Sequence, residues 1–452
     1  MKSSRSNFTS RIGFILSAAG SAVGLGNIWR FPYLAAQYGG GTFLLCYIIL
    51  AVTFGFALMT AEIALGRKTG LSAIGAFSAL NKRYRFVGVL VTLVPVIIFP
   101  YYSVIGGWVI KYFFTFLTGG VSAAAEDTYF TGFISGVSEP IVWFVIFTAI
   151  TAAVVICGVE KGIEKVSKVM MPLLVVLTVG ISLYVLTIDG AMEGVKYYVL
   201  PHMSDFSLKT LLSSMGQLFY SMSLAMGIMI TYGSYMSKST NLESSVRQIE
   251  IFDTGIAFFA GLMIVPAVFA FSGGDPSALK AGPGLMFITL PKVFASIRFG
   301  GFLGTVFFVL VFFAAITSAI SLMETIVSIL MDFFHWSRRK TSILVFIYSL
   351  LMGVPSSLGF GIWDFVKPLG MSILDAWDFI SNSILMPIVA LLTCFFAGFV
   401  IKPKAIIEEA CAEGAVFKGK HLFTVVIKWV APVILVAILI SSILNALGIF
   451  VM

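Results

Sequence analysis

The sequence predicts an all-α polytopic membrane protein with about eleven transmembrane helices. Hydrophobic residues make up 59% of the 452 residues and charged residues only 11%, and phenylalanine alone occurs 43 times. Water-soluble domains contain about twice that share of charged residues. A spanning helix needs about 20 apolar residues, and about eleven such runs are separated by charged or Gly/Pro-rich breaks. They centre near Gly24, Phe54, Tyr102, Phe147, Val176, Ser223, Met263, Ala314, Tyr348, Leu391 and Val436.

Basic residues gather in the loops on one side of this topology, which sets the expected orientation. Cytoplasmic loops of membrane proteins are enriched in Lys and Arg. The pattern therefore places the N-terminus in the cytoplasm and, with an odd number of spans, the C-terminus outside, in a multi-pass protein of the cell (plasma or inner) membrane. It also explains the net charge of +8 without a nucleic-acid partner. Examples are Arg11, Arg67, Lys68, Lys82, Arg83, Arg85, Lys161, Lys165, Lys168, Lys238, Arg247, Arg338, Arg339, Lys340, Lys402 and Lys404.

Several other classes of protein are disfavoured by the composition. His202, His335 and His421 are expected in loops, and no HExxH or GxSxG pattern accompanies them, so we do not expect an enzyme. The four cysteines have neither paired spacing nor a nearby histidine, so neither a disulfide framework nor a zinc site is predicted. We also expect no removable signal peptide, no organic cofactor and no obligate protein partner.

The first span contains a break at residues 20–33, which read Gly-Ser-Ala-Val-Gly-Leu-Gly-Asn-Ile-Trp-Arg-Phe-Pro-Tyr. Glycines, an amide, a guanidinium and a proline at that depth do not fit an ordinary spanning helix. Backbone freed from helical hydrogen bonds is tolerated in a bilayer only where protein buries it or a watery cavity faces it. The break therefore predicts a binding site.

A comparable break follows five spans later, at residues 216–227. Interrupted helices at matching places in two five-span halves point to an inverted-repeat secondary transporter with its site at the midplane. We therefore expect a single transmembrane transporter domain over residues 1–452. Its first repeat is expected at 12–188 (helices 1–5), its second at 209–400 (helices 6–10) and helix 11 at 422–449.

Residues 24–33, Gly-Leu-Gly-Asn-Ile-Trp-Arg-Phe-Pro-Tyr, resemble the first-helix signature of the neurotransmitter:sodium symporters. The similarity continues at 287–291 (Phe-Ile-Thr-Leu-Pro) and 314–318 (Ala-Ala-Ile-Thr-Ser) and covers nearly the whole chain. Eleven spans and short loops are similar to the bacterial branch, and within it to multi-substrate hydrophobic amino-acid transporters. The resemblance implies a LeuT-like fold with unwound helices 1 and 6, and sodium-coupled uptake of hydrophobic or aromatic L-amino acids by alternating access. A transport-silent amino-acid sensor is the alternative, and only a measured flux separates the two.

An amino-acid substrate needs donors for its carboxylate and acceptors for its ammonium. Free N–H groups at a half-helix start, around Leu25 and Gly26, favour an anion because the positive end of the helix dipole lies there. The resemblance adds the Tyr102 hydroxyl, although an interfacial aromatic is the alternative. By the same resemblance, Met226 stands where a leucine-selective relative has phenylalanine. Its thioether can adapt to apolar groups of different shape, and simple packing is the alternative. The resemblance also implies the walls of the side-chain cavity. Together, the predicted substrate-binding residues are Ala22, Gly24, Leu25, Gly26, Tyr102, Tyr220, Ser221, Ser223, Met226, Ser318 and Leu322, with Ile98 as a further candidate.

Two sodium sites are implied by the resemblance, and sodium is a hard cation that prefers oxygen ligands. The first would use Ala22, Asn27, Ser221 and Asp253 and would share the substrate carboxylate as a ligand. The second would use the carbonyls of Gly20, Val23 and Ala314 with the hydroxyls of Thr317 and Ser318. Ordinary back-bonding within a helix is the alternative for these two hydroxyls.

Asp253 departs from the asparagine usual among relatives. Chloride-dependent members of the family place an anion nearby, and a fixed carboxylate could replace that charge, so chloride independence is predicted. Asp253 is either a direct sodium ligand or a proton-exchanging acid. Glu62 and Glu324 are further acids within spans, where burial alone is unfavourable. Glu62 is expected to organise the unwound backbone.

The resemblance also implies two gates. Arg30 and Asp378 would close the outer side through water, supported by Gln217, and Arg5 and Asp332 the inner side, supported by Tyr235. Phe8 replaces a tryptophan common beside the inner gate. Gly162 and Pro172 would allow the start of the fifth span to unwind, because both residues weaken helical order. A capped helix start with a tolerated proline is the alternative.

Overall fold

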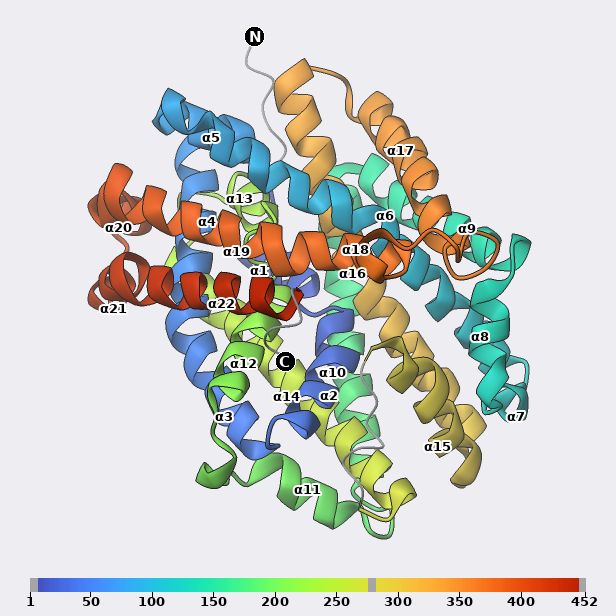
Figure 1. Cartoon of the computed structure of the whole chain (residues 1–452). Coiled ribbons are helices and arrows are strands. Elements are labelled where there is room, and N and C mark those ends of the chain that lie inside the picture. Colours follow the sequence, from blue (N-terminus) through green and yellow to red (C-terminus); the bar gives the residue numbers. More distant parts are fainter. Residues whose placement is uncertain (1–6, 275–281, 447–452) are drawn as a thin grey trace.

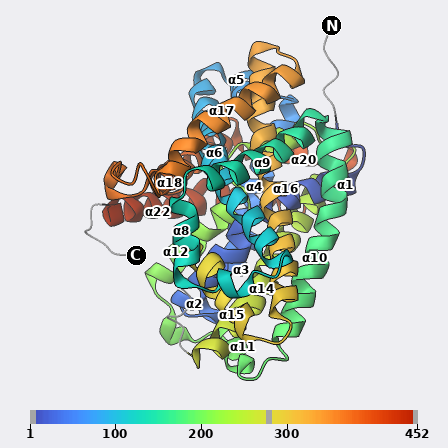
Figure 2. The same ribbon diagram turned by 90° about the vertical axis from the view of Figure 1, so that its right-hand side faces the viewer.

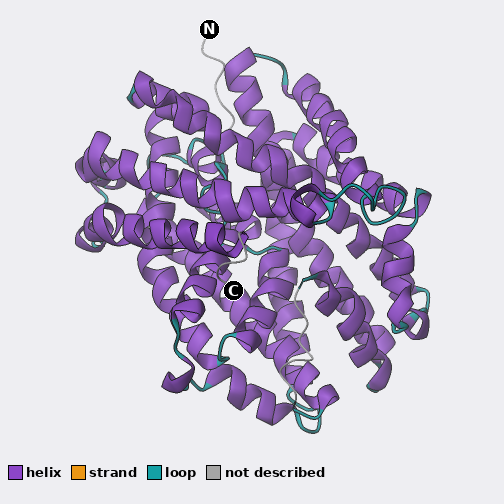
Figure 3. Ribbon diagram, in the orientation of Figure 1, coloured by secondary structure: helices purple, strands orange, loops and turns teal. Residues whose placement is uncertain are grey.

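Helices account for all regular structure within residues 7–274 and 282–446, the part of the chain that this computed structural model describes (Figures 1 and 3). In this part, nine helices are long and apolar enough to cross a membrane, and a tenth span is formed by a pair bent by 52°. The predicted all-α polytopic class is therefore confirmed. Helix α5 lies at one end of the molecule, and α11 and α15 lie at the opposite end (Figures 1 and 2).

The first half of the chain begins with the bent span, in which the π-helical η1 connects α1 to α2. The second span is continuous through a second π-helical turn, and the fifth span starts with a third. In order, the elements are α1 (Arg11–Ala22), η1 (Gly26–Arg30), α2 (Phe31–Gln37), α3 (Gly41–Leu50), η2 (Ala51–Gly55), α4 (Phe56–Thr69), α5 (Ala73–Leu80), η3 (Lys82–Tyr84), α6 (Arg85–Leu117), α7 (Val121–Ala124), α8 (Asp127–Ser135), α9 (Ser138–Ile156), η4 (Val159–Glu164), α10 (Lys165–Val185), α11 (Ala191–Val199) and η5 (Met203–Asp205).

The second half begins with α12 and α13, which occupy the place of the expected sixth span. Residues 222–227 between them are not helical, so neither helix alone is long enough to cross a membrane. The elements are α12 (Leu208–Ser221), α13 (Ile228–Gly233), α14 (Leu242–Ser272), η7 (Leu285–Thr289), α15 (Leu290–Ser296), α16 (Gly300–Phe334), α17 (Arg338–Leu358), η8 (Pro368–Gly370), α18 (Ile373–Asp378), η9 (Phe379–Leu385), α19 (Met386–Phe395), η10 (Phe396–Val400), α20 (Lys402–Ala410), η11 (Ala412–Gly414), α21 (Lys420–Val425), η12 (Val426–Val430) and α22 (Ala431–Ala446).

Local interactions explain both interruptions. α1 ends because Val23 turns to an extended conformation (φ −74°, ψ 95°), and the Gly24 N–H donates to Asn27 Oδ1 at 3.1 Å. In the second break, Ser223, Ala225 and Gly227 adopt φ of 52°, 60° and 74°. The first two are strained, since L side chains disfavour this region. The break is held by Glu62, whose Oε1 accepts the Ala225 N–H at 2.8 Å.

The two helices α4 and α13 pack backbone against backbone. A Cβ atom on Gly66 would lie 1.8 Å from the Ile230 carbonyl oxygen, and one on Gly233 would lie 2.3 Å from the Ile63 carbonyl oxygen. Both contacts are closer than any real Cβ contact, so only glycine fits. The half-helix α13 is therefore fixed against the unbroken second span rather than free to move by itself.

Gly66→Ala should destabilise the protein by about 1–3 kcal/mol, because the added methyl group overlaps backbone that cannot move without shifting α13. A lower midpoint of thermal unfolding in detergent would show this. Gly180→Ala is the matched control: it also lies in a spanning helix, but a Cβ there meets nothing within 4 Å. The control should be neutral or slightly stabilising. Equal midpoints for the two variants would contradict the packing described.

Candidate functional site

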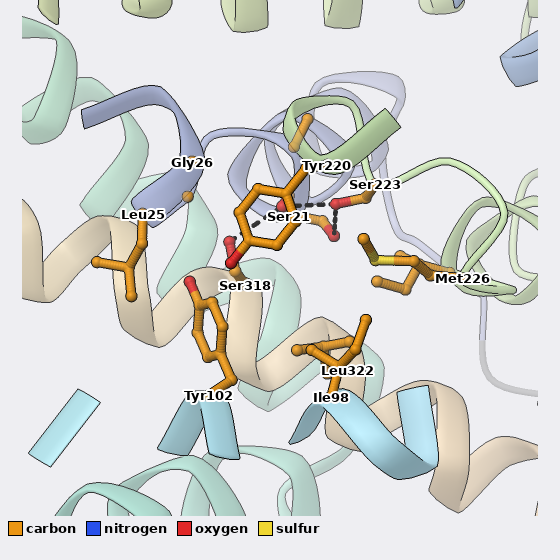
Figure 4. Close-up of a pocket in the computed structure, with 13 residues that line it drawn as sticks. Ser21, Leu25, Gly26, Ile98, Tyr102, Tyr220, Ser223, Met226, Ser318 and Leu322 are labelled. Carbon is orange, nitrogen blue, oxygen red and sulfur yellow. Dashed lines mark hydrogen bonds between the residues drawn. The ribbon is translucent and has the colours of Figure 1, made fainter. Parts of the chain in front are cut away.

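A cavity lies between the two breaks (Figure 4). Its walls come from the end of α1, the residues after it, α6, the 222–227 break and α16. Ten of the eleven predicted substrate-binding residues line it, together with Ile98. Ser21 and Ile228 also line it and were missed by the sequence analysis. Ser221 does not, because its hydroxyl is directed to Asp253. The lining residues are Ser21, Ala22, Gly24, Leu25, Gly26, Ile98, Tyr102, Tyr220, Ser223, Met226, Ile228, Ser318 and Leu322.

Backbone and hydroxyl groups form the polar end of this cavity. A Cβ on Gly24 would lie 2.7 Å from Ser318 Oγ and 3.3 Å from the Tyr102 hydroxyl, so these three groups are neighbours. A Cβ on Gly26 would lie 2.4 Å from a ring carbon of Tyr220. The glycines thus leave the backbone accessible between two tyrosines, as a close approach to a ligand requires.

Three hydroxyls tie the breaks to each other. The carbonyl oxygen of Ser21 accepts from Ser223 Oγ at 2.8 Å and from Ser318 Oγ at 3.0 Å. Ser21 Oγ in turn donates to Ser223 Oγ at 3.2 Å. The end of α1, the second break and α16 are joined in this way at a single carbonyl.

The opposite end of the cavity is apolar. Ile98, Met226 and Leu322 lie together there (Figure 4), and Ile228 adds a further aliphatic wall. A ligand with one polar end and one hydrophobic end matches this division. The lining contains no Asp, Glu, Lys or Arg that would balance a net charge on the ligand.

Beside the cavity, three buried polar side chains surround one buried carboxylate, that of Asp253. Asp253 Oδ1 accepts from Asn27 Nδ2 and from Ser221 Oγ, both at 2.8 Å. Asp253 Oδ2 accepts from the Tyr47 hydroxyl at 2.8 Å. The sequence analysis had grouped Asn27, Ser221 and Asp253 and missed Tyr47, which no local motif marks.

The chemistry of this cluster fits a hard cation. It offers carboxylate, amide and hydroxyl oxygens, and the described residues contain no group of three or more His, Cys, Asp or Glu that would hold a transition metal. Oxygen-only donor sets of this kind suit sodium. Ala22, which was predicted for the same cation site, lines the adjacent cavity.

The residues predicted for a second sodium site also come together. Ser318 Oγ lies 3.5 Å from the Gly20 carbonyl oxygen, and a Cβ on Gly20 would lie 3.3 Å from Thr317 Cβ. Thr317 Oγ1 donates to the carbonyl oxygens of Phe313 (2.8 Å) and Ala314 (3.2 Å), which is the back-bonding alternative. Val23 ends α1 next to this group.

The predicted outer gate is not a direct ion pair. Arg30 Nη1 lies 3.4 Å from the Gly216 carbonyl oxygen, and its guanidinium is 5.5 Å from the centre of the Tyr220 ring. Asp378 Oδ1 accepts from Asn382 Nδ2 at 2.6 Å and from the Tyr101 hydroxyl at 3.1 Å. The expected supporting residue Gln217 donates to the Gly26 carbonyl oxygen at 2.9 Å.

Of the two residues predicted for the inner gate, Arg5 lies outside the described residues. Its predicted partner Asp332 accepts from the N–H (2.8 Å) and hydroxyl (2.5 Å) of Ser72, at the start of α5. Tyr235 donates to Glu324 Oε1 at 2.7 Å, and Arg338 forms a two-pronged pair with the same carboxylate at 2.6 and 2.9 Å. Arg338 was not singled out from the sequence as a partner of Glu324.

A helical membrane protein with two interrupted spans, a cavity between them and an adjacent oxygen-rich cluster has the architecture of a secondary transporter. Comparison with known proteins gives the family. The model of the Sodium:neurotransmitter symporter family matches residues 5–132 and 134–449, and the chain belongs to this family of sodium-coupled transporters.

Individual relatives agree with this assignment. The uncharacterized sodium-dependent transporter YhdH of Bacillus subtilis (strain 168) is 36% identical over 407 residues, which cover 89% of each chain. The sodium- and chloride-dependent GABA transporter 2 of Homo sapiens is 25% identical over 435 residues, or 82% of this chain and 71% of that one. The crystal structure of MhsT in complex with L-phenylalanine matches with a TM-score of 0.87 and 38% identity, covering 97% of this chain and 100% of that one. This similarity confirms the predicted LeuT-like fold.

Tyr47→Phe should weaken sodium binding, because one oxygen of the buried Asp253 carboxylate loses its donor. An ion that binds only the folded state raises the melting temperature. We expect the sodium concentration that gives half of this rise to be about tenfold higher in Tyr47→Phe than in the unmodified protein.

Tyr112→Phe serves as the control, because its hydroxyl donates to the Phe287 carbonyl oxygen at 2.8 Å, away from the cluster. It removes a comparable buried hydrogen bond and should leave the sodium response unchanged. The same sodium response in both variants would argue against a cation at Asp253.

Proposed function

We propose that this protein takes up hydrophobic and aromatic L-amino acids together with sodium, by alternating access and without chloride. The observation that carries the proposal is the division of the cavity, which has exposed backbone and hydroxyls at Gly24, Gly26 and Tyr102, and aliphatic walls at Ile98 and Leu322. The similarity to MhsT, which was solved with L-phenylalanine, supports this substrate class.

The two charged groups of the substrate would use different parts of the break. The N–H groups of Leu25 and Gly26 and the Tyr102 hydroxyl would donate to the carboxylate. The unwound carbonyls of Ala22, Tyr220 and Ser223 would accept from the ammonium. Because the lining residues carry no formal charge, a neutral zwitterion is favoured over a charged amino acid.

Sodium would bind at two places. In our proposal Ala22, Asn27, Ser221 and Asp253 hold the first ion, with the substrate carboxylate as a further ligand, and this shared ligand couples ion to substrate. Gly20, Val23, Ala314, Thr317 and Ser318 would hold the second. Two ions moving down a 100 mV potential and a tenfold gradient release roughly 7 kcal/mol, which is enough for concentrative uptake.

Asp253 would also make chloride unnecessary, because the carboxylate supplies the negative charge next to the first ion. We place the N-terminus in the cytoplasm and the C-terminus outside, with repeats at 12–188 and 209–400 and helix 11 at 422–449. Arg30 and Asp378 would close the outer side through water, and Asp332, with Arg5, would help to close the inner side.

Uptake of labelled tryptophan or leucine into proteoliposomes tests the central proposal. We expect concentrative uptake only with an inward sodium gradient, unchanged when gluconate replaces chloride, and reduced at least tenfold by Asn27→Ala. That substitution removes a proposed sodium ligand and a donor to Asp253. Saturable binding without flux would instead identify a transport-silent sensor.

Met226→Phe should narrow the substrate range, since a rigid ring replaces a flexible thioether at the apolar end of the cavity. We expect the affinity for tryptophan and phenylalanine to fall about tenfold or more, and the affinity for leucine to fall less. Competition against labelled leucine measures all three affinities. Met229→Phe, at another buried methionine that does not line the cavity, controls for general effects of added volume. An equal loss for all three amino acids would contradict the assignment.

A further inference from the structure

The start of the fifth span is weakly held by its own hydrogen bonds. Residues Val159–Glu164 wind as the π-helical η4 after Gly158, whose φ is 90°, and only then does α10 begin. Pro172 within α10 has no N–H, so the Lys168 carbonyl lacks its helical partner. π-Helical turns are rare and are found mostly at functional sites. The conformation of this stretch therefore depends on contacts with other elements.

One of those contacts is a buried carboxylate that binds the start of α1. Glu164, with its side chain 2% exposed, accepts from the Thr9 N–H at 2.8 Å and the Thr9 hydroxyl at 2.6 Å. It also accepts from the Ser10 hydroxyl at 3.1 Å, and Lys168 Nζ lies 2.6 Å from Oε1. Three of these four donors lie 154 or 155 positions away in the chain. Hydrogen bonds to an ionised carboxylate are about twice as strong as neutral ones.

The geometry of α1 is adapted to this carboxylate. Ser10 is the N-cap of α1 and accepts the Gly13 N–H at 3.0 Å while donating to Glu164. A Cβ on Gly13 would lie 2.0 Å from Glu164 Oε1, so the carboxylate occupies the space of a side chain. It also lies by the positive end of the α1 dipole, where an anion is stabilised.

Two other contacts hold the same end of α1, but they are of a different kind. Phe8 N–H donates to the Tyr235 carbonyl oxygen at 3.1 Å, and its ring packs edge-on against Phe14, Tyr232 and Tyr235. Arg11 Nη2 donates to Ser244 Oγ at 2.6 Å at the exposed surface. Neither contact involves η4, so Glu164 connects α1 to the weak segment.

We propose that Glu164 is a positioning residue for transport, which holds the inner end of α1 closed against η4 and makes opening of helix 1 depend on loosening of η4. The physical reason is that a buried carboxylate cannot lose three donors without gaining water. When α1 moves away, Glu164 has to reach solvent, which it does only if η4 moves as well. The proposal rests on alternating access in the proposed function.

The test uses a reporter cysteine in α1. Ser17 is 1% exposed, so in Ser17→Cys the alkylation rate by N-ethylmaleimide reports how often helix 1 opens. The exposed Cys157 and half-exposed Cys411 are replaced by serine in the background. In sodium, Glu164→Ala should raise the alkylation rate on the order of tenfold. It should also raise the half-saturating sodium concentration by a similar factor, because the apparent affinity falls with the fraction of closed protein.

Three further variants separate positioning from general destabilisation. Glu164→Gln keeps the shape of the side chain and loses its charge, so it should raise the alkylation rate less than Glu164→Ala does. Thr9→Val removes one donor at the other side of the contact and should raise the rate a few-fold. Lys168→Met removes the half-exposed partner, leaves the bonds to Thr9 and Ser10 in place, and should have no effect.

An unchanged alkylation rate in the Glu164 variants and in Thr9→Val would overturn the proposal, even if their melting temperatures fall. So would an equal increase in Lys168→Met. If Glu164→Ala does not fold, Glu164→Gln and Thr9→Val decide by the same rate. The reaction needs sodium only, so it gives an answer even if the protein takes up none of the proposed amino acids.

Discussion

Every polar backbone group released by a helix break inside a membrane has to find a partner, because the bilayer core offers no water. The rest of this structure depends on how the two breaks meet that requirement. Asn27 Oδ1 takes the Gly24 N–H, and Glu62 takes the Ala225 N–H. Glycines at 24 and 26 then leave neighbouring backbone open to the cavity. The candidate binding site is thus made of the backbone groups that the side chains do not use.

The carboxylates inside the bundle differ in which group balances their negative charge. Glu324 is paired with Arg338, and Glu409 with Arg67 at 2.8 Å, so the protein supplies the cation in both cases. Within the described residues, the hydrogen-bond donors to Asp253 are all neutral: an amide and two hydroxyls. Glu62 also has a neutral donor, but it is a backbone N–H that the break requires. A carboxylate among oxygen atoms and without a protein cation is where an external cation fits best.

The sequence was sufficient for features that depend on local chemistry. Glycine, proline and a polar side chain within an apolar run are visible in one segment, so both breaks were predicted from the residues alone. Most of the predicted cavity-lining residues followed from the resemblance to the symporter family. Partner choice across the fold was not visible. Tyr47 reaches Asp253 from a helix with no motif, and Ser72, which donates to Asp332, was not singled out from the sequence either. Ser221 was assigned both to the cavity and to the group around Asp253, and its hydroxyl donates to Asp253, 32 positions away. Arg30 and Asp378 likewise have hydrogen-bond partners that the sequence did not indicate: Arg30 contacts the Gly216 carbonyl oxygen, and Asp378 accepts from Asn382.

Asn27 suggests why ion and substrate binding would be coupled over so short a distance. Its amide nitrogen donates to Asp253, and its amide oxygen accepts the Gly24 N–H. A carbonyl oxygen has two lone pairs, so a sodium ion on the second one would leave the first in place. The ion would then fix the orientation of the backbone at residues 24–27, which carries the N–H groups proposed for the substrate carboxylate. Coupling of this kind needs no long pathway, because the cation ligand and the anion donors belong to the same four residues.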